Sequence, residues 1–240
     1  MEKINLFCLP YAGGTAMIYN RLKKYLGSSI NLIPIELAGR GMRSKESFYE
    51  SIEEAVEDIY SSIEDKLDGT KFAFLGHSMG TLLEYELIYK IYKLKNQMPI
   101  HAFFSGRHTP QAIKEKEDLY KLEDSDFIKV IYKIGGTPKG FFENEELVNM
   151  FIPILKADYK IVETYVHKEK KEKFKFDITI FNGKDDKDIS ISDSYEWENL
   201  TLKNCEVYIF DGGHFFILDK LKDIGEIISE KLEANRLVGC

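Results

Sequence analysis

Short apolar runs alternate with segments of helical periodicity along most of the chain, and this alternation constrains the fold more than any other feature. Six runs have the length and composition of buried strands: Ile4–Leu9, Asn31–Ile35, Lys71–Leu75, Ala102–Ser105, Ile178–Asn182 and Cys205–Phe210. One helical stripe between them consists of Ile52, Val56, Ile59, Ile63 and Leu67, and another of Leu221, Ile224, Ile228 and Leu232. Strands and helices that alternate in this way form parallel βαβ units with helices on both sheet faces, so the sequence predicts an α/β fold.

The alternation stops between about residues 109 and 170, where no strand-like run occurs. Two stripes of helical spacing fill this region: Phe127, Val130, Ile131 and Ile134, then Leu147, Phe151, Leu155 and Tyr159. The segment Gly135-Gly136-Thr137-Pro138 predicts a break between helices, because proline cannot extend a helix. Long insertions in α/β sheets usually cover the strand carboxyl ends, where ligands bind. We therefore expect a helical lid within a single domain of residues 1–240, since no repeat or linker marks a boundary.

Composition and charge exclude several classes of function. The formal net charge is −7 and the pI is near 5.4, which argues against nucleic acid as the main partner, since phosphate binding needs a basic face. The chain has neither a signal-like start nor a run of about 20 apolar residues, so we expect a cytoplasmic protein without a membrane partner. We also expect a monomer. Cys8, Cys205 and Cys240 are widely spaced, which fits a reducing compartment and argues against a zinc site.

The sequence GHSMG, residues 76 to 80, follows an apolar strand and precedes a segment of amphipathic helix, Thr81 to Lys93. A serine at a sharp strand-to-helix turn has a strained backbone, so the residues two positions away on either side must lack side chains, as Gly76 and Gly80 do. The turn raises Ser78 Oγ above the sheet edge, where the amides of the following helix also point. Ser78 is therefore the candidate nucleophile.

A serine nucleophile needs a base, and the base needs an acid that orients it. In this type of fold the chain order is serine, acid, histidine. His214 lies in a glycine-containing loop directly after the strand Cys205–Phe210, level with Ser78, and is the candidate base. His108, at the start of the insertion, and His167, in a charged run, are typical of surface histidines.

Three aspartates follow the strand Ile178–Asn182, in the sequence FNGKDDKD. The cluster lacks the glycine and terminal glutamate of a calcium loop, so a metal site is not favoured. Asp186, three residues past the turn glycine, is the preferred acid, with Asp185 as the alternative. Its role is to accept the Nδ1 proton of His214 and keep Nε2 facing Ser78.

Acyl transfer also needs two N–H groups aimed at the developing oxyanion. One is expected from Met79, directly after the nucleophile. The other is expected from the glycine-containing loop after the first strand, where backbone can approach substrate closely. Ala12 is the preferred second donor, and Tyr11 is the alternative.

Several motifs, in this order, resemble those of the stand-alone (external) type II thioesterases of nonribosomal peptide and polyketide synthesis, of the surfactin type. They are Phe7–Gly14, Glu36–Arg43, GHSMG, Leu155–Tyr159, FNGKDDK and DGGHFF. The similarity covers nearly the whole chain, including the insertion. The resemblance implies an α/β-hydrolase fold with the catalytic triad at Ser78, Asp186 and His214. Ala38 stands where the family usually has proline, and Lys156 where it usually has arginine.

The resemblance also implies the substrate and the partner. The substrate is an acyl group held as a thioester on the phosphopantetheine arm of an acyl or peptidyl carrier protein, and no separate cofactor or metal is expected. Such carriers are commonly acidic, so the lysines from Lys168 to Lys173 are a candidate docking patch. Two alternatives remain open: a carboxylesterase or lipase acting on free esters, and a non-catalytic carrier-binding module.

Overall fold

The computed structural model describes residues 3–112, 117–136 and 140–237. Its centre is a six-stranded sheet with the order β2-β1-β3-β4-β5-β6, in which every neighbouring pair is parallel. The strands are β1 (Ile4–Leu9), β2 (Ile30–Pro34), β3 (Phe72–His77), β4 (His101–Ser105), β5 (Asp177–Gly183) and β6 (Cys205–Phe210). The predicted α/β class is confirmed, and the predicted runs all form strands. The largest difference is in β3, which continues to His77 rather than ending at Leu75.

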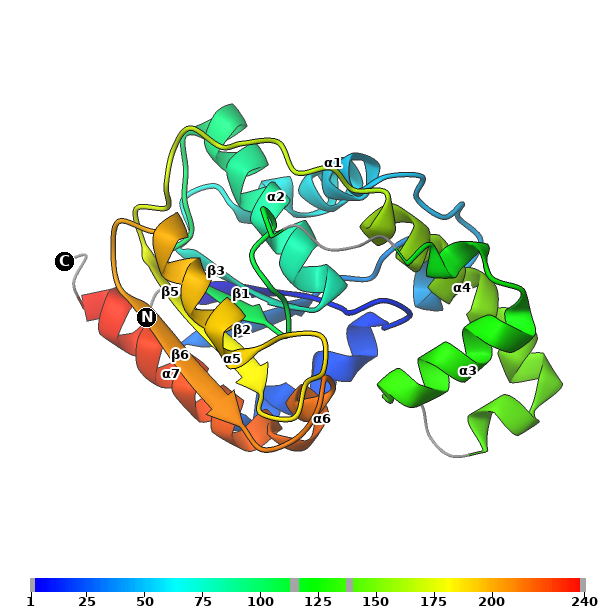
Figure 1. The fold of residues 1–240 in the computed structure, drawn as a ribbon. Helices are drawn as coiled ribbons and strands as arrows, with labels where there is room; N and C mark the ends of the chain where they lie inside the picture. Colours follow the sequence, from blue (N-terminus) through cyan, green and yellow to red (C-terminus); the bar gives the residue numbers. More distant parts are fainter. Residues whose placement is uncertain (1–2, 113–116, 137–139, 238–240) are drawn as a thin grey trace.

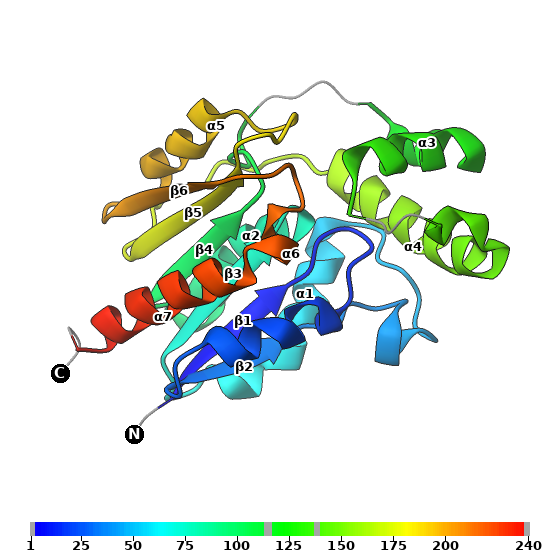
Figure 2. The same ribbon diagram turned by 90° about the horizontal axis from the view of Figure 1, so that it is seen from below.

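Helices cover both faces of the sheet (Figure 2). One face carries α1 (Ile52–Ile63), α2 (Met79–Lys95) and the 3₁₀ helix η6 (Glu196–Leu200). The other carries η1 (Ala16–Tyr25), α6 (Phe216–Asp219) and α7 (Leu221–Leu237). The remaining helical elements are η2 (Gly41–Arg43), η3 (Glu64–Lys66), η4 (Leu119–Lys121), α3 (Asp124–Ile134), η5 (Phe141–Glu143), α4 (Glu145–Glu163) and α5 (Ile191–Tyr195).

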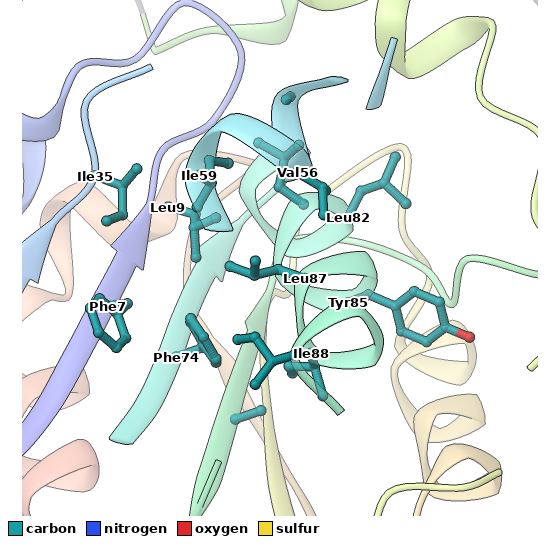
Figure 3. Packing of buried hydrophobic residues seen from close by; sticks show 14 of the residues in the cluster. Phe7, Leu9, Ile35, Val56, Ile59, Phe74, Leu82, Tyr85, Leu87 and Ile88 are labelled. Carbon is teal, nitrogen blue, oxygen red and sulfur yellow. The ribbon is translucent and has the colours of Figure 1, made fainter. Parts of the chain in front are cut away.

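Alternate side chains of each strand contribute to two separate cores. Phe7 of β1 and Phe74 of β3 pack with α1 and α2 (Figure 3), whereas Leu6 and Cys8 of β1 pack with the residues of α7 on the opposite face. Successive strand residues point to opposite sides of a sheet, and here both sides are covered. This double burial explains why the strands have continuous apolar sequences.

The helix α2 is buried more completely than the predicted amphipathic segment. Leu82, Leu83, Glu84 and Tyr85 are consecutive, yet all are buried, because the sheet, α1 and the region around Trp197 enclose the first half of the helix. Glu84 therefore carries a carboxyl group into the core. Burial raises the pKa of this carboxyl well above its ordinary value.

The helical insertion, defined as α3, α4 and the 3₁₀ helices η4 and η5, lies between β4 and β5 in sequence and beyond one end of the sheet in space (Figure 1). It has a small core of its own, formed by Phe127, Ile131, Ile152 and Leu155. Helix α3 ends before Gly135, at the predicted break, while residues 137–139 lie outside the described residues. The single-domain organisation and the lid role stay predictions.

The predicted stripe of α4 is only part of its buried face. Leu147 is 37% exposed, whereas Ile152, Leu155, Asp158 and Ile161 are buried. The difference arises because α4 contacts both the sheet domain and α3, and its buried face therefore includes a charged residue that an apolar stripe excludes. Asp158 is central to the contact between the insertion and the rest of the molecule.

In the described ranges, no helix is both long enough and apolar enough to cross a membrane. Cys8 lies buried in β1 and Cys205 lies in β6, and both thiols are free. Cys240 lies outside the described residues.

Candidate active site

Ser78 occupies the turn between β3 and α2, with φ at 53° and ψ at −112°. A non-glycine residue with positive φ stores strain of about 1–3 kcal/mol, so the surrounding structure must hold it. Its N–H donates to Ser105 O at 2.8 Å, across to β4, and its carbonyl accepts from Thr81 N–H at 3.1 Å. Both sides of the strained residue are therefore fixed by hydrogen bonds.

The two glycines of GHSMG make this turn sterically feasible. A Cβ atom on Gly76 would lie 2.4 Å from Gly80 O, and one on Gly80 would lie 2.1 Å from Leu9 O. Real Cβ atoms do not approach so closely, so the predicted reason for both glycines is confirmed. Gly80 also serves a purpose that sequence reasoning missed, since it lets α2 begin against the end of β1.

The structure brings Ser78, His214 and Asp186 into one hydrogen-bonded row. His214 Nε2 lies 3.0 Å from Ser78 Oγ, and His214 Nδ1 lies 2.8 Å from Asp186 Oδ2. The three residues follow β3, β6 and β5, whose carboxyl ends share one sheet edge. The two other histidines considered as the base lie elsewhere: His108 Nδ1 contacts Thr109 O, and His167 Nδ1 contacts Tyr165 OH.

The aspartates after β5 take different positions. The Asp186 side chain is 1% exposed, and its second oxygen accepts from Asp188 N–H at 3.0 Å. The Asp185 side chain is exposed, while its N–H donates to Gly212 O at 2.9 Å. The geometry thus favours Asp186 over Asp185 as the partner of His214, because a fixed carboxylate on Nδ1 directs Nε2 toward Ser78.

His77 lies next to His214 and was missed as a site residue, because it occupies a variable position of the G-x-S-x-G pattern. It is fully buried, its Nδ1 lies 2.8 Å from Ser105 Oγ, and its ring centre lies 5.3 Å from that of His214. Burial lowers the pKa of His77 well below its ordinary value, and the nearby His214 lowers it further. His77 is therefore neutral near pH 7 and adds no competing positive charge beside His214.

The predicted oxyanion donors lie at the same corner of the molecule. Met79 is the first residue of α2, and the first N–H groups of a helix have no acceptor within it. In the loop after β1, Gly13 N–H donates to Asp158 Oδ2 and Gly14 N–H donates to Tyr11 O. The candidate donors that remain in Tyr11–Gly14 are Ala12 and Tyr11, the two that the sequence predicted.

A cavity of about 240 Å³ opens beside Ser78 and His214. The loop after β1 forms one wall. Apolar and aromatic side chains of the helical insertion form much of the rest: Ile131, Ile134, Phe141, Phe151, Leu155 and Tyr159. A cavity with a mostly apolar wall, and with Ser78 and His214 at one side, fits an acyl chain better than a charged ligand.

A buried ion pair joins the insertion to the loops around this cavity. Arg40 donates to both carboxylate oxygens of Asp158, at 2.6 and 2.7 Å. Both residues belong to motifs that carry the family resemblance, but sequence reasoning gave neither a role. The one sequence feature that could have indicated a role was Asp158 itself, a single aspartate beside the apolar stripe of α4.

The lysines of the predicted docking patch are partly neutralised. Lys168 pairs with Glu53 of α1 at 2.9 Å, and Lys170 pairs with Glu86 of α2 at 2.7 Å. Because these carboxylates offset the positive charge, the patch is a weaker attractor for an acidic carrier than the sequence indicates. The docking role stays a prediction.

Comparison with known proteins identifies the family. Residues 4–232 match the family described as Thioesterase domain. The chain is 33% identical over 230 residues to the gramicidin S biosynthesis protein GrsT of Aneurinibacillus migulanus, covering 96% of this chain and 89% of that protein. It is 34% identical over 218 residues to the medium-chain S-acyl fatty acid synthase thioesterase of Anas platyrhynchos, covering 89% of this chain and 85% of that protein.

The crystal structure of ClbQ from the colibactin NRPS/PKS pathway superposes with a TM-score of 0.95 at 33% identity, over 99% of this chain and 100% of that one. This likeness, together with the parallel sheet, confirms the α/β-hydrolase fold that the resemblance implied. The surfactin-type assignment within the family stays a prediction. The chain belongs to the thioesterase family.

Proposed function

We propose that this chain is an editing thioesterase that removes acyl groups from the phosphopantetheine arm of carrier proteins in nonribosomal peptide or polyketide synthesis. The observation that carries the proposal is the hydrogen-bonded row of Ser78, His214 and Asp186 at the mouth of an apolar cavity. Similarity to GrsT and to ClbQ, two proteins named for such pathways, supports the type of substrate.

In the acylation half of the reaction, Ser78 Oγ attacks the thioester carbonyl carbon while His214 Nε2 takes the hydroxyl proton. Asp186 keeps the Nδ1 proton of His214 in place and stabilises the imidazolium. The N–H groups of Met79 and Ala12 hold the oxyanion, and loss of one such donor costs about 10²–10³-fold in kcat. The carbon–sulfur bond then breaks, and His214 returns its proton to the departing thiolate.

In the deacylation half, His214 takes a proton from a water molecule, which attacks the ester on Ser78. The carbon–oxygen bond to Ser78 breaks, Ser78 recovers its proton from His214, and the free acid leaves. The arm enters between the helical insertion and the sheet domain, so movement of the insertion controls access. We expect a cytoplasmic monomer that uses no metal or cofactor of its own.

The test compares one acyl group on three supports: a carrier protein, a small free thioester and a free oxygen ester. The proposal predicts the highest kcat/KM for the carrier-bound thioester, because contacts with the carrier add binding energy that the small esters lack. Equal or higher kcat/KM for the oxygen ester would instead identify a carboxylesterase. Failure of a serine-directed fluorophosphonate to label Ser78 would identify a non-catalytic carrier-binding module.

A second candidate function is release of medium-chain acyl groups from a fatty acid synthase. The apolar lining of the cavity and the 34% identity to the Anas platyrhynchos thioesterase favour it. A panel of acyl lengths on one carrier separates the two functions. An editing enzyme accepts short and varied acyl groups, whereas a chain-releasing enzyme shows a maximum of kcat/KM at medium length.

A further inference from the structure

Three segments that are far apart in the sequence meet at the carboxylate of Asp158. Its Oδ1 accepts from Arg40 Nη2 at 2.7 Å, and its Oδ2 accepts from Arg40 Nη1 at 2.6 Å and from Gly13 N–H at 2.7 Å. Asp158 belongs to α4, Arg40 to the connection between β2 and α1, and Gly13 to the loop after β1. Arg40 and Asp158 are each 2% exposed, so these contacts are made away from bulk water.

A gain in folding stability does not by itself explain the buried ion pair of Arg40 and Asp158. Two charges lose hydration when they are buried, and replacing a buried ion pair with apolar side chains of similar volume is often neutral or stabilising. The pair does provide geometry, because a guanidinium and a carboxylate joined by two parallel bonds have a fixed mutual orientation. The spare acceptor capacity of that fixed carboxylate is used by Gly13 N–H.

Two hydrogen bonds then determine where the Ala12 N–H points. The bond from Gly13 N–H to Asp158 fixes the peptide plane after Ala12, and the bond from Gly14 N–H to Tyr11 O, at 2.8 Å, fixes the plane before it. The Tyr11 carbonyl and the Ala12 N–H belong to one trans peptide unit, so they point in opposite directions. With the carbonyl turned inward to Gly14, the Ala12 N–H faces away from the turn.

Helix α4 also packs directly on this loop. A Cβ atom on Gly13 would lie 2.8 Å from Leu155 Cδ2 and 3.0 Å from the Phe151 ring, so no side chain fits between the loop and the helix. The carboxylate that holds Gly13 comes from the same helix. The loop is therefore held at Gly13 by both a carboxylate and apolar side chains of α4.

We propose that Arg40 and Asp158 are positioning residues that aim the Ala12 N–H at the oxyanion and couple this donor to the seated position of α4. The inference rests on the proposed function, because it concerns the same site. It predicts that the network acts on the transition state, where the oxyanion exists. Its loss lowers kcat while KM stays nearly constant.

The experiment compares two double variants that differ only in the acceptor offered to Gly13. Arg40→Met with Asp158→Asn keeps an oxygen acceptor at position 158, whereas Arg40→Met with Asp158→Leu has none, and neither leaves a buried charge. We expect the Leu variant to lose at least about tenfold in kcat, up to the roughly 10²-fold cost of a displaced catalytic group, with KM within about twofold of wild type. The Asn variant recovers most of the loss, although its melting temperature is no higher than that of the Leu variant.

A matched control is Lys160→Met, which removes a surface ion pair between α4 and Glu50 without touching the loop after β1. Its kcat should equal that of wild type. If the double variants do not fold, Asp158→Asn and Asp158→Ala make a second comparison, in which both remove the charge that pairs with Arg40 and only Asn keeps an oxygen acceptor. Equal kcat for the two members of a pair, or a loss confined to KM, overturns the proposal.

Each variant is assayed on an acyl carrier protein and on a short-chain p-nitrophenyl ester. If the wild-type protein hydrolyses the ester but not the acyl carrier, the proposed function fails. The ranking of the variants on the ester still decides whether Arg40 and Asp158 position the oxyanion donor. The two failures are therefore distinguishable.

Discussion

Asp186 and His214 meet beyond the ends of two neighbouring strands, with Asp186 Oδ2 at 2.8 Å from His214 Nδ1. The strands β5 and β6 pair so that Gly183 lies beside Phe210, and both residues stand a few positions past that point. The Asp185 N–H bond to Gly212 O ties the two loops together through the backbone. The direction of the imidazole ring is thus set by the register of the sheet.

The relationship between these two residues predicts the effect of two neighbouring substitutions. Asp186→Asn should lower kcat roughly 10³–10⁴-fold, because an amide no longer selects the tautomer of His214 that accepts a proton from Ser78. Asp185→Asn, at an exposed position, should change kcat less than about threefold. Steady-state hydrolysis of an acyl carrier protein measures both. A reversed ranking would identify Asp185 as the acid.

The turn at Ser78 predicts a stability difference between two glycine substitutions. Gly80→Ala places a Cβ atom against the backbone of β1 and should lower the free energy of unfolding by at least about 3 kcal/mol, or prevent folding. Gly69, unlike Gly80, has positive φ, but a Cβ atom added there would meet no atom within 4 Å, so Gly69→Ala should lose only about 1–2 kcal/mol. Urea unfolding compares the two. Equal losses would mean that the contact with Leu9 O is relieved at little cost.

The buried Glu84 predicts how stability depends on pH. Its pKa is raised in the folded protein, so the native state holds a proton that the unfolded chain releases above about pH 4.3. The stability from this group is fully present below the unfolded pKa and is lost as pH rises toward the folded pKa, by about 1.4 kcal/mol per pH unit.

Glu84→Gln removes this proton release while keeping the shape of the side chain. The melting temperature of the variant minus that of wild type should therefore increase between about pH 5 and pH 8. Thermal unfolding at several pH values measures the difference. A constant difference across this range would show that Glu84 titrates alike in the folded and unfolded states.

The cavity predicts a change in acyl preference. Phe151 lines the cavity and packs against Phe141 with ring centres 5.0 Å apart, so Phe151→Ala should make room for longer acyl chains. Each further buried methylene contributes about 0.8 kcal/mol, or roughly fourfold in kcat/KM. Met150→Ala serves as the control, because this neighbour on α4 is 63% exposed. An unchanged chain-length profile for Phe151→Ala would place the acyl group elsewhere.

Much of the fold could be predicted because its signals are local. Burial on both faces produced the continuous apolar runs of the strands, and the run Cys205–Phe210 coincides with β6. Ser78 and His214 each follow a strand, so their common sheet edge could be inferred. Asp186 could not be separated firmly from Asp185 by sequence, because the choice depends on the path of the backbone after Gly183.

The contact between Arg40 and Asp158 could not be predicted, because it joins residues 118 positions apart and no period links them. The buried face of α4 could be predicted only in part, for a related reason. Phe151, Leu155 and Tyr159 line the cavity, whereas Ile152 and Ile161 pack inward, and only the placement of α4 on the molecule separates these faces.

The most direct test of covalent catalysis at Ser78 is rapid-quench mass spectrometry after the protein is mixed with an acyl-loaded carrier protein. We predict a transient mass increase equal to the acyl group, located on the peptide that contains Ser78. Ser78→Ala should stay folded, show no such adduct and hydrolyse the substrate at least roughly 10³-fold more slowly. An adduct on another residue, or turnover by Ser78→Ala at the wild-type rate, would contradict the assignment of Ser78 as the nucleophile.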